Sequence, residues 1–124
     1  MPVRHVSVVS LPVSNPDRSS AFFCDSLGFE LRRDAPLGPQ GGRWIEVAPP
    51  GAQTSLTLVT WFEDMTPGSV QGLVLDTADI ERTRGELSRK QVVLSEIKNA
   101  PWGRYCTFQD PDGNGFVLVQ AGAR

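Results

Sequence analysis

Apolar and polar positions along the chain predict a strand followed by a helix near the N-terminal end. The segment VSVVSLPVS (6–14) is rich in valine, and Asn15-Pro16-Asp17 follows it as a helix start. Asn15 can cap the first turn, Pro16 has the backbone φ that suits the first helical position, and Asp17 favours the positive end of the helix dipole. We expect this helix to end at Gly28, because glycine accepts the left-handed conformation that closes many helices.

Alternation of apolar and polar residues resumes at Phe29 and predicts a second strand. Two more β-rich segments follow, RWIEV (43–47) and SLTLVTWF (55–62). The prolines and glycine of residues 48–52 predict a turn between them. The first half of the chain is therefore expected to form a strand, a helix and three further strands.

The second half of the sequence repeats this order. GLVLD (72–76) is a predicted strand, Thr77 is the predicted cap of the next helix, and QVVL (91–94) returns to strand. Gln91 stands where the first half has Gly28. This is a departure from the pattern, because a left-handed residue other than glycine costs about 1 kcal/mol.

Two strands and a turn complete the second half. RYCTF (104–108) and GFVLVQ (115–120) are β-rich, and residues 109–114 contain the proline and glycine of a turn. The acidic residues of this turn resemble the opening of a calcium loop, but such a loop needs a glutamate at its twelfth position, which is Ala121 here. We therefore predict a hairpin connection, and we interpret residues 64–69 as the linker between the halves.

Length and composition limit the class of protein. A chain of 124 residues fits one domain, 1–124, whose core needs no disulfides. Cys24 and Cys106 are predicted to be free thiols of a cytoplasmic protein, and no apolar run approaches the roughly 20 residues that cross a membrane. Fourteen acidic and twelve basic side chains give a net charge of −2 without a basic stripe, so we expect no nucleic-acid partner. His5 is the single histidine, which excludes mechanisms that need two from one chain.

The duplicated order of elements, with PVSNPDRSSAFFCDSLGFEL (12–31) in the first half and DPDGNGFVL (110–118) in the second, resembles the vicinal oxygen chelate superfamily. That superfamily includes glyoxalases, extradiol dioxygenases, fosfomycin-modifying enzymes and bleomycin-resistance proteins. The resemblance implies an α+β fold in which two βαβββ modules, residues 3–63 and 69–121, form curved mixed sheets around a cavity. It also implies a homodimer with the cavity at or near the interface.

The resemblance further locates the positions at which metal-using members hold their metal. These positions fall on Val8, Thr57, Gln71 and Val117. Val8 and Val117 offer no ligand atom, and Thr57 and Gln71 alone would make a weak site. We therefore expect neither a metal nor another cofactor, and we expect these four residues to line the cavity.

Aromatic residues form a second group of candidates. Trp44 and Trp61 fall on predicted strands, and Trp61 is expected to face the same cavity as Thr57 if the strand continues that far. Trp102 and Arg104 lie close together at a strand mouth, where they suit a planar or anionic ligand. Core or dimer packing explains each single tryptophan about as well. The predicted ligand-binding residues are Trp44, Thr57, Trp61, Gln71, Trp102 and Arg104.

These features favour a metal-independent small-molecule binding protein, similar to bleomycin-resistance proteins, that sequesters an antibiotic or an aromatic metabolite. No catalytic residue is identified. The alternative is a glyoxalase- or dioxygenase-like enzyme, a lyase or an oxidoreductase, whose metal ligands have shifted to Gln71, Glu46 or Glu63. A third interpretation is a scaffold or subunit that binds no ligand.

Overall fold

The computed structural model describes residues 2–39 and 41–122. The elements follow one another as β1 (Val8–Pro12), α1 (Pro16–Ala21), η1 (Phe22–Ser26), β2 (Glu30–Pro36), β3 (Arg43–Ala48), β4 (Ser55–Val59), β5 (Leu73–Asp76), α2 (Ile80–Arg89), β6 (Lys98–Ala100), β7 (Gly103–Gln109) and β8 (Gly115–Ala121). The η1 segment is a π-helical turn that continues α1.

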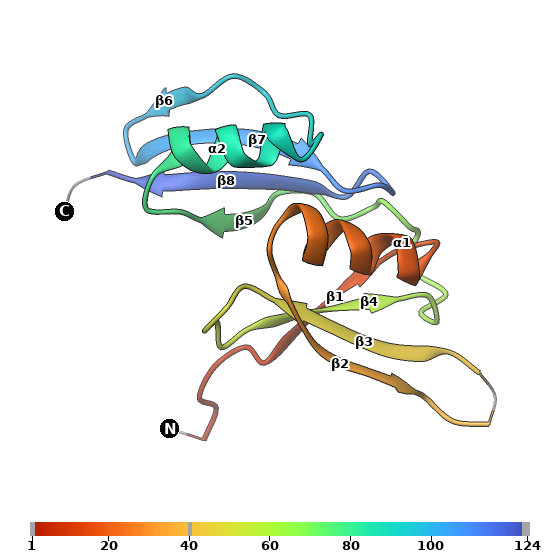
Figure 1. The fold of residues 1–124 in the computed structure, drawn as a ribbon. Helices are drawn as coiled ribbons and strands as arrows, with labels where there is room; N and C mark the ends of the chain where they lie inside the picture. The colour runs from red at the N-terminus through yellow and green to blue at the C-terminus, as the bar shows by residue number, and fades with distance from the viewer. Residues whose placement is uncertain (1, 40, 123–124) are drawn as a thin grey trace.

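The strands form two four-stranded sheets, one from each half of the chain (Figure 1). Sheet A has the strand order β1-β4-β3-β2, and sheet B has the order β5-β8-β7-β6. In each sheet the first and last strands of the module pair in parallel, and the other neighbours are antiparallel. The predicted α+β fold with two βαβββ modules is therefore confirmed.

The first helix begins and ends where the sequence predicts. The side chain of Asn15 accepts a hydrogen bond of 3.1 Å from the main-chain N–H of Arg18, as an N-cap residue does. After η1 the chain reverses at Gly28, whose φ is 75°. Gly28 thus supplies the left-handed residue that lets the chain leave the helix and enter β2.

The predicted cap of the second helix is wrong. Asp79, and not Thr77, caps α2, because the Asp79 carboxylate accepts a hydrogen bond of 3.1 Å from the N–H of Arg82. The hydroxyl of Thr77 instead lies 2.7 Å from the hydroxyl of Thr83 and shares a hydrogen bond with it. The helix therefore starts two residues later than a Thr77 cap would place it.

The strand predicted at residues 91–94 is also wrong. Gln91 does take a left-handed φ of 70°, but the residues after it enter no strand until β6. Arg84 of α2 explains this, because its Nε and Nη2 donate hydrogen bonds of 2.8 and 3.3 Å to the carbonyls of Ser95 and Leu94. Those carbonyls are occupied by a helix side chain and do not pair along β7.

The two modules share one hydrophobic core. Leu11, Ile45 and Leu58 of sheet A are fully buried in it, and Phe116 of sheet B is 2% exposed. Phe23 of η1 is also fully buried, with its ring centroid 5.7 Å from that of Phe116. Since alternate strand residues point to opposite faces, each sheet has a second face turned away from this core, which we call its outer face.

The turn at residues 110–114 fastens the second module to the first. Asp112 accepts hydrogen bonds from the main-chain N–H and the hydroxyl of Ser14 and from Nη2 of Arg18. Asn114 donates from Nδ2 to the carbonyl of Pro12 at 2.9 Å. The predicted hairpin connection is confirmed, and its polar residues serve the junction between the modules.

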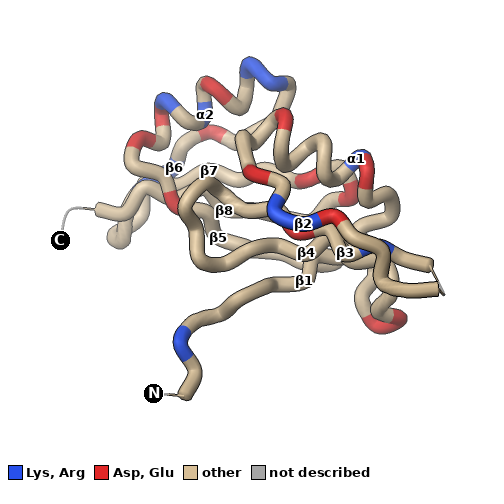
Figure 2. The backbone as a smooth tube through the Cα atoms, turned by 60° about the horizontal axis from the view of Figure 1, so that its bottom comes forward, with Lys and Arg blue, Asp and Glu red and all other residues tan. Residues whose placement is uncertain are grey.

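Charged residues of both signs are interspersed on the molecule. Figure 2 shows basic and acidic positions interspersed along α2 and along β2. Within residues 2–39 and 41–122, no helix has the length and apolar character that a membrane span requires.

Candidate functional site

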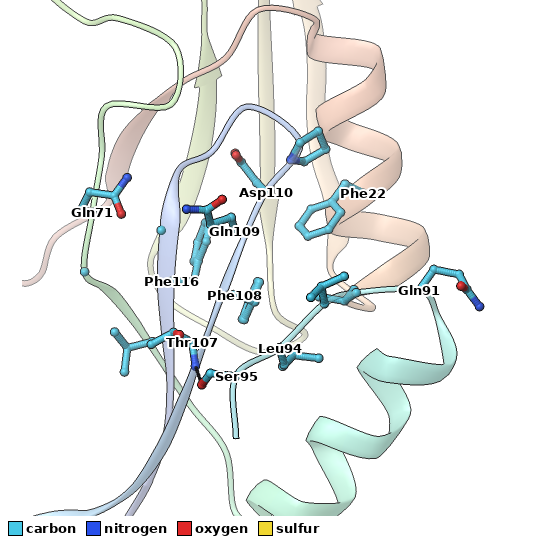
Figure 3. A pocket seen from close by; sticks show the side chains of 16 residues that line it. Phe22, Gln71, Gln91, Leu94, Ser95, Thr107, Phe108, Gln109, Asp110 and Phe116 are labelled. Atoms are coloured by element: carbon cyan, nitrogen blue, oxygen red, sulfur yellow. Dashed lines mark hydrogen bonds between the residues drawn. The ribbon is translucent and has the colours of Figure 1, made fainter. Parts of the chain in front are cut away.

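An open cavity of about 810 Å³ lies in the second module, and we call it the module-two cavity (Figure 3). The cavity begins at residues 91–95, which follow α2. It crosses the edge of β7 that faces away from β8 and ends on the outer face of sheet B. Its lining consists of Phe22, Gln71, Gly72, Gln91, Val92, Val93, Leu94, Ser95, Thr107, Phe108, Gln109, Asp110, Pro111, Gly115, Phe116 and Val117. Two of the predicted positions, Gln71 and Val117, are therefore part of one concave site.

The cavity exists because β6 is short. In the first module, β2 pairs with β3 along its whole length, from Arg43 to Ala48. In the second module, β6 pairs only with residues 103–105 of β7. Beyond that point Ser95 hydrogen-bonds to Thr107 at the edge of β7, and residues 91–94 form no strand where the corresponding strand of the first module lies.

Aromatic rings form one wall of the cavity. Phe22 is half-buried, so part of its ring faces the opening, and its centroid lies 6.5 Å from that of Phe108. Phe108 stacks on Phe116 with centroids 5.2 Å apart and an interplanar angle of 7°. Figure 3 shows Phe22 projecting from the helical segment toward the strands that carry Phe108 and Phe116. Because Phe108 and Phe116 are only 4% and 2% exposed, they support the wall from behind, and Phe22 is the ring on which a flat aromatic ligand could stack.

The rim of the cavity is polar but carries no free charge. Gln71 is held in place, because its Nε2 donates hydrogen bonds of 3.3 and 3.0 Å to the carbonyls of Gly68 and Gly113. Its Oε1 lies close to Gly115, where a side chain would collide with it. The amide oxygen of Gln71 is thus a fixed hydrogen-bond acceptor at the cavity, which agrees with its orientation in Figure 3.

Among the described residues that line the cavity, Asp110 is the one with a charged side chain, and both oxygens of its carboxylate accept hydrogen bonds within the turn. Oδ1 accepts hydrogen bonds from the N–H groups of Asp112 and Asn114 at 2.9 and 2.8 Å, and Oδ2 accepts one from Nδ2 of Asn114 at 2.9 Å. Asp110 is 5% exposed. The carboxylate therefore shapes the turn and is not offered to a ligand.

Trp44 lies on β3 of sheet A and Trp61 in the loop after β4, and neither lines the module-two cavity. Their ring centroids are 6.2 Å apart with an interplanar angle of 28°, so the rings stack. Nε1 of Trp44 donates a hydrogen bond of 3.0 Å to Glu46. The sequence predicted that Trp61 would lie on the same strand face as Thr57 if the strand continued that far. Instead, β4 ends at Val59, and the loop after it positions Trp61 against Trp44.

Thr57 and Val8 lie on the same outer face of sheet A. Thr57 pairs directly with Ser10 on one side and with Glu46 on the other, and Val8 pairs with Ser55. Thr57 is fully buried, and its hydroxyl has no hydrogen-bond partner among the residues that the structure describes. The single chain therefore keeps Thr57 out of reach of a ligand.

Trp102 and Arg104 do not form the pair that the sequence predicted. Trp102 is 55% exposed and stacks on Tyr105, with centroids 5.2 Å apart. Nη2 of Arg104 forms an ion pair of 2.7 Å with Glu81 of α2, on the helix side of sheet B. Neither residue lines the module-two cavity, and their role in ligand binding stays a prediction.

The residues at the metal positions of the superfamily do not fit a divalent metal. Val8 and Val117 have no donor atom, Thr57 is buried on another sheet, and the amide nitrogen of Gln71 is bonded to main-chain carbonyls. In residues 2–39 and 41–122, no three His, Cys, Asp or Glu side chains converge as metal ligands would. Oε1 of Glu46 instead accepts a hydrogen bond of 3.0 Å from Nε1 of Trp44.

The two thiols are not activated as nucleophiles. Burial raises the pKa of the Cys24 thiol, and it also raises the pKa of the Cys106 thiol despite the nearby charge of Arg84. A higher pKa lowers the fraction of reactive thiolate. This supports the prediction that both residues serve packing.

Sequence reasoning missed most of the cavity wall. It did not select Phe22, Phe108 or Gln109, although all three lie next to segments that it used to recognise the fold. Phe22 looked like a core residue of a helix. Nothing in the local sequence singles out Gln109, which stands directly before the turn.

Comparison with known proteins agrees with the geometry of the fold. Residues 4–118 match the family described as the glyoxalase/bleomycin resistance protein/dioxygenase superfamily. Because this match spans nearly the whole chain, the protein belongs to that superfamily. The resemblance inferred from the sequence is confirmed.

Two solved structures and one curated protein are similar along almost the whole chain. TnmS3, an antibiotic binding protein from a Streptomyces species, shares 44% identity with a TM-score of 0.92, covering 98% of this chain and 99% of that one. A superfamily member from Sphaerobacter thermophilus shares 35% identity with a TM-score of 0.89, covering 97% and 99%. YetH of Bacillus subtilis, a protein described as uncharacterized, is 32% identical over 122 residues, which are 95% of this chain and 99% of YetH.

Proposed function

We propose that this protein binds a flat organic molecule, of the kind represented by aromatic antibiotics, and holds it without transforming it. The observation that carries the proposal is the module-two cavity, which joins the half-buried ring of Phe22 to a polar rim whose one carboxylate, that of Asp110, is bonded within its turn. The 44% identity to an antibiotic binding protein supports the same class of ligand. The apolar residue Val117, at a position where metal-using relatives hold their metal, supports binding over metal-assisted chemistry.

Three groups of residues would contact the ligand. Phe22 would stack on its ring system, and Gln71 would accept a hydrogen bond through Oε1. Trp44 and Trp61 would provide a second aromatic surface from sheet A. Aromatic stacking of this kind contributes about 0.5–1.5 kcal/mol for each ring pair beyond the burial of apolar area.

A homodimer would bring the two surfaces together, and we propose that this is the active form. In one chain the tryptophan pair and the module-two cavity lie on different sheets. The outer face of sheet B exposes Val74, which is 60% accessible, next to Val117. A second copy that covered this face with the outer face of its own sheet A would bury Val74 and place its tryptophans opposite the cavity.

Tryptophan fluorescence and thermal unfolding test the proposal together. Planar aromatic antibiotics are titrated into the protein, and a true ligand should quench the fluorescence and raise the melting temperature. The variants Trp44→Phe and Trp61→Phe should each reduce the quenching, whereas Trp102→Phe is the comparison for a tryptophan outside the proposed surface. A series of planar antibiotics that changes neither signal would contradict the proposal.

Metal analysis separates the binding protein from the enzyme alternative. The alternative needs a metal held by Gln71 with Glu46 or Glu63, and it predicts stoichiometric Ni, Zn, Fe or Mn in the purified protein. Our proposal predicts that ligand binding is unchanged after treatment with a chelator. Loss of bound metal together with loss of a catalytic activity in the Gln71→Ala variant would favour the enzyme.

A further inference from the structure

The open edge of β7 is the feature that the proposed function does not yet explain. Tyr105 is the last residue of β7 that pairs with β6. The next residue on that edge, Thr107, receives a hydrogen bond of 2.9 Å from the main-chain N–H of Ser95 and donates one of 2.9 Å to the Ser95 hydroxyl. Beyond Thr107 no described residue pairs with this side of β7, and the edge runs into the module-two cavity.

The main-chain groups of Gln109 point toward this open edge. In an antiparallel ladder, alternate residues direct their N–H and C=O to opposite neighbours. The bonds of Thr107 to Ser95 show that the main-chain N–H and C=O of Thr107 point away from β8. The main-chain N–H and C=O of Gln109, two residues later, therefore point the same way. Gly115, which lies opposite Gln109, agrees with this because its N–H donates to the carbonyl of Val70 at 2.8 Å and not to β7.

The charge of the lining restricts the ligand that this edge can take. Of the cavity-lining residues in the described part of the chain, Asp110 is the one with an ionisable side chain, and its carboxylate is hydrogen-bonded within the turn. An ion would thus lose its hydration in the cavity without meeting an opposite charge, which is costly. An uncharged molecule with its own donor and acceptor would instead match the free N–H and C=O of Gln109.

We propose that the ligand of the module-two cavity is an uncharged molecule with a flat aromatic body and a lactam or carboxamide edge. The edge pairs with the main-chain N–H and C=O of Gln109, as a short piece of strand added to β7 would. The ring system then extends toward Phe22. This inference rests on the proposed function and specifies the ligand class of the same cavity.

Four small probes test the ligand class on the unmodified protein. 6(5H)-Phenanthridinone carries a lactam edge, its N-methyl derivative lacks the N–H, phenanthrene lacks the whole amide, and 9-phenanthrenecarboxylate adds a charge to the same rings. Calorimetric titration should rank phenanthridinone first, with the N-methyl derivative and phenanthrene each weaker by about tenfold, which one net hydrogen bond can supply. The carboxylate should bind most weakly. Equal affinities for phenanthridinone and phenanthrene, or a preference for the carboxylate, would overturn the inference.

Two variants of Gln109 locate the contact on the main chain. Proline is tolerated at a strand position whose N–H does not enter the ladder, so Gln109→Pro removes the outward donor and keeps the pairing with β8. Gln109→Ala is the matched control, because it removes the side chain and keeps the N–H. The lactam should bind about tenfold more weakly to Gln109→Pro and within about threefold of the original affinity to Gln109→Ala. Equal lactam binding by the two variants would contradict a main-chain contact, and the probe series decides the question if Gln109→Pro does not fold.

This inference and the proposed function can fail separately. If planar antibiotics quench Trp44 and Trp61 while the lactam shows no advantage over phenanthrene, the binding function holds and the lactam edge is wrong. If neither the antibiotics nor any of the four probes bind, both are wrong. A preference for the lactam that Gln109→Pro abolishes supports both.

Discussion

The hydroxyl of Ser14 donates a hydrogen bond of 2.5 Å to Oδ1 of Asp112, which joins the start of module one to the last turn of module two. The same oxygen accepts from the main-chain N–H of Ser14 and from Nη2 of Arg18, each at 3.2 Å. The side chain of Asp112 is 5% exposed. The acidic turn near the C-terminus therefore fastens the two modules together, and the cavity lies directly beside it.

Replacing Asp112 should weaken this junction. Asp112→Ala removes the acceptor of three hydrogen bonds, and bonds to a charged group contribute about 1.5–3 kcal/mol each when a partner is lost. We expect the free energy of unfolding in urea to fall by at least about 2 kcal/mol. Ser14→Ala, which removes the hydroxyl alone, should cost about 1 kcal/mol. An Asp112→Ala protein as stable as the original would show that the junction is held by other contacts.

Gly68 and Gly51 both have a left-handed backbone, but only Gly68 is also in close contact with another residue. Gly68 has a φ of 83°, and a Cβ there would collide with the carbonyl oxygen of Asp112. Gly51 has a similar φ of 77° but open space around it. Gly51→Ala should therefore cost about 1 kcal/mol for the left-handed backbone alone. Gly68→Ala should cost about 1–3 kcal/mol more, because the turn must move. Equal losses in urea unfolding would rule out the close contact.

The ion pair between Asp34 and Arg43 predicts a specific pH dependence. Nε and Nη2 of Arg43 donate hydrogen bonds of 3.1 and 2.7 Å to the two carboxylate oxygens of Asp34, and these bonds lower the pKa of Asp34. A lowered pKa in the folded state stabilises the fold above the unfolded pKa of about 3.9, and this contribution is lost as the pH falls through the lower folded value. Carbon-detected NMR should place the midpoint of Asp34 below about 3.9, and Arg43→Gln should return it toward that value. An unchanged midpoint in Arg43→Gln would mean that Arg43 is not the cause.

The thiols should react slowly in the folded protein. Cys106 is fully buried and Cys24 is half-buried, and burial raises the pKa of both. At pH 7.5 iodoacetamide should modify the Cys106→Ser variant, which keeps Cys24, faster than the Cys24→Ser variant, and urea should remove the difference. Mass spectrometry follows both reactions. Rapid modification of Cys106 without urea would indicate that sheet B opens readily.

The fold followed from the sequence because local signals and periodicity agreed. Asn15-Pro16-Asp17 and Gly28 mark the ends of the first helical segment, and the repeat of strand, helix and strands predicts the second module. The cap of α2 was missed because Thr77 and Asp79 are both good caps, and only the packing decides between them. The strand at 91–94 was missed because Arg84, seven residues upstream of Gln91, takes carbonyls that a strand would use.

The site was less predictable than the fold because it depends on an edge and not on a motif. Gln71 and Val117 were selected by their position in the family pattern, and both line the module-two cavity. Gln109 became a candidate only when β6 was seen to stop pairing at Tyr105. The point at which β6 stops pairing cannot be read from the residue types of β7.

Equilibrium dialysis with mass spectrometry tests the central claim most directly. The protein is dialysed against planar aromatic antibiotics, and mass spectrometry gives the amount and the molecular mass of each compound that the protein retains. We predict that at least one compound is retained in proportion to the protein, with its mass unchanged, and that Phe22→Leu lowers its affinity by about tenfold through the lost stacking. Retention of none of the compounds, or recovery of a chemically altered product, would contradict the account.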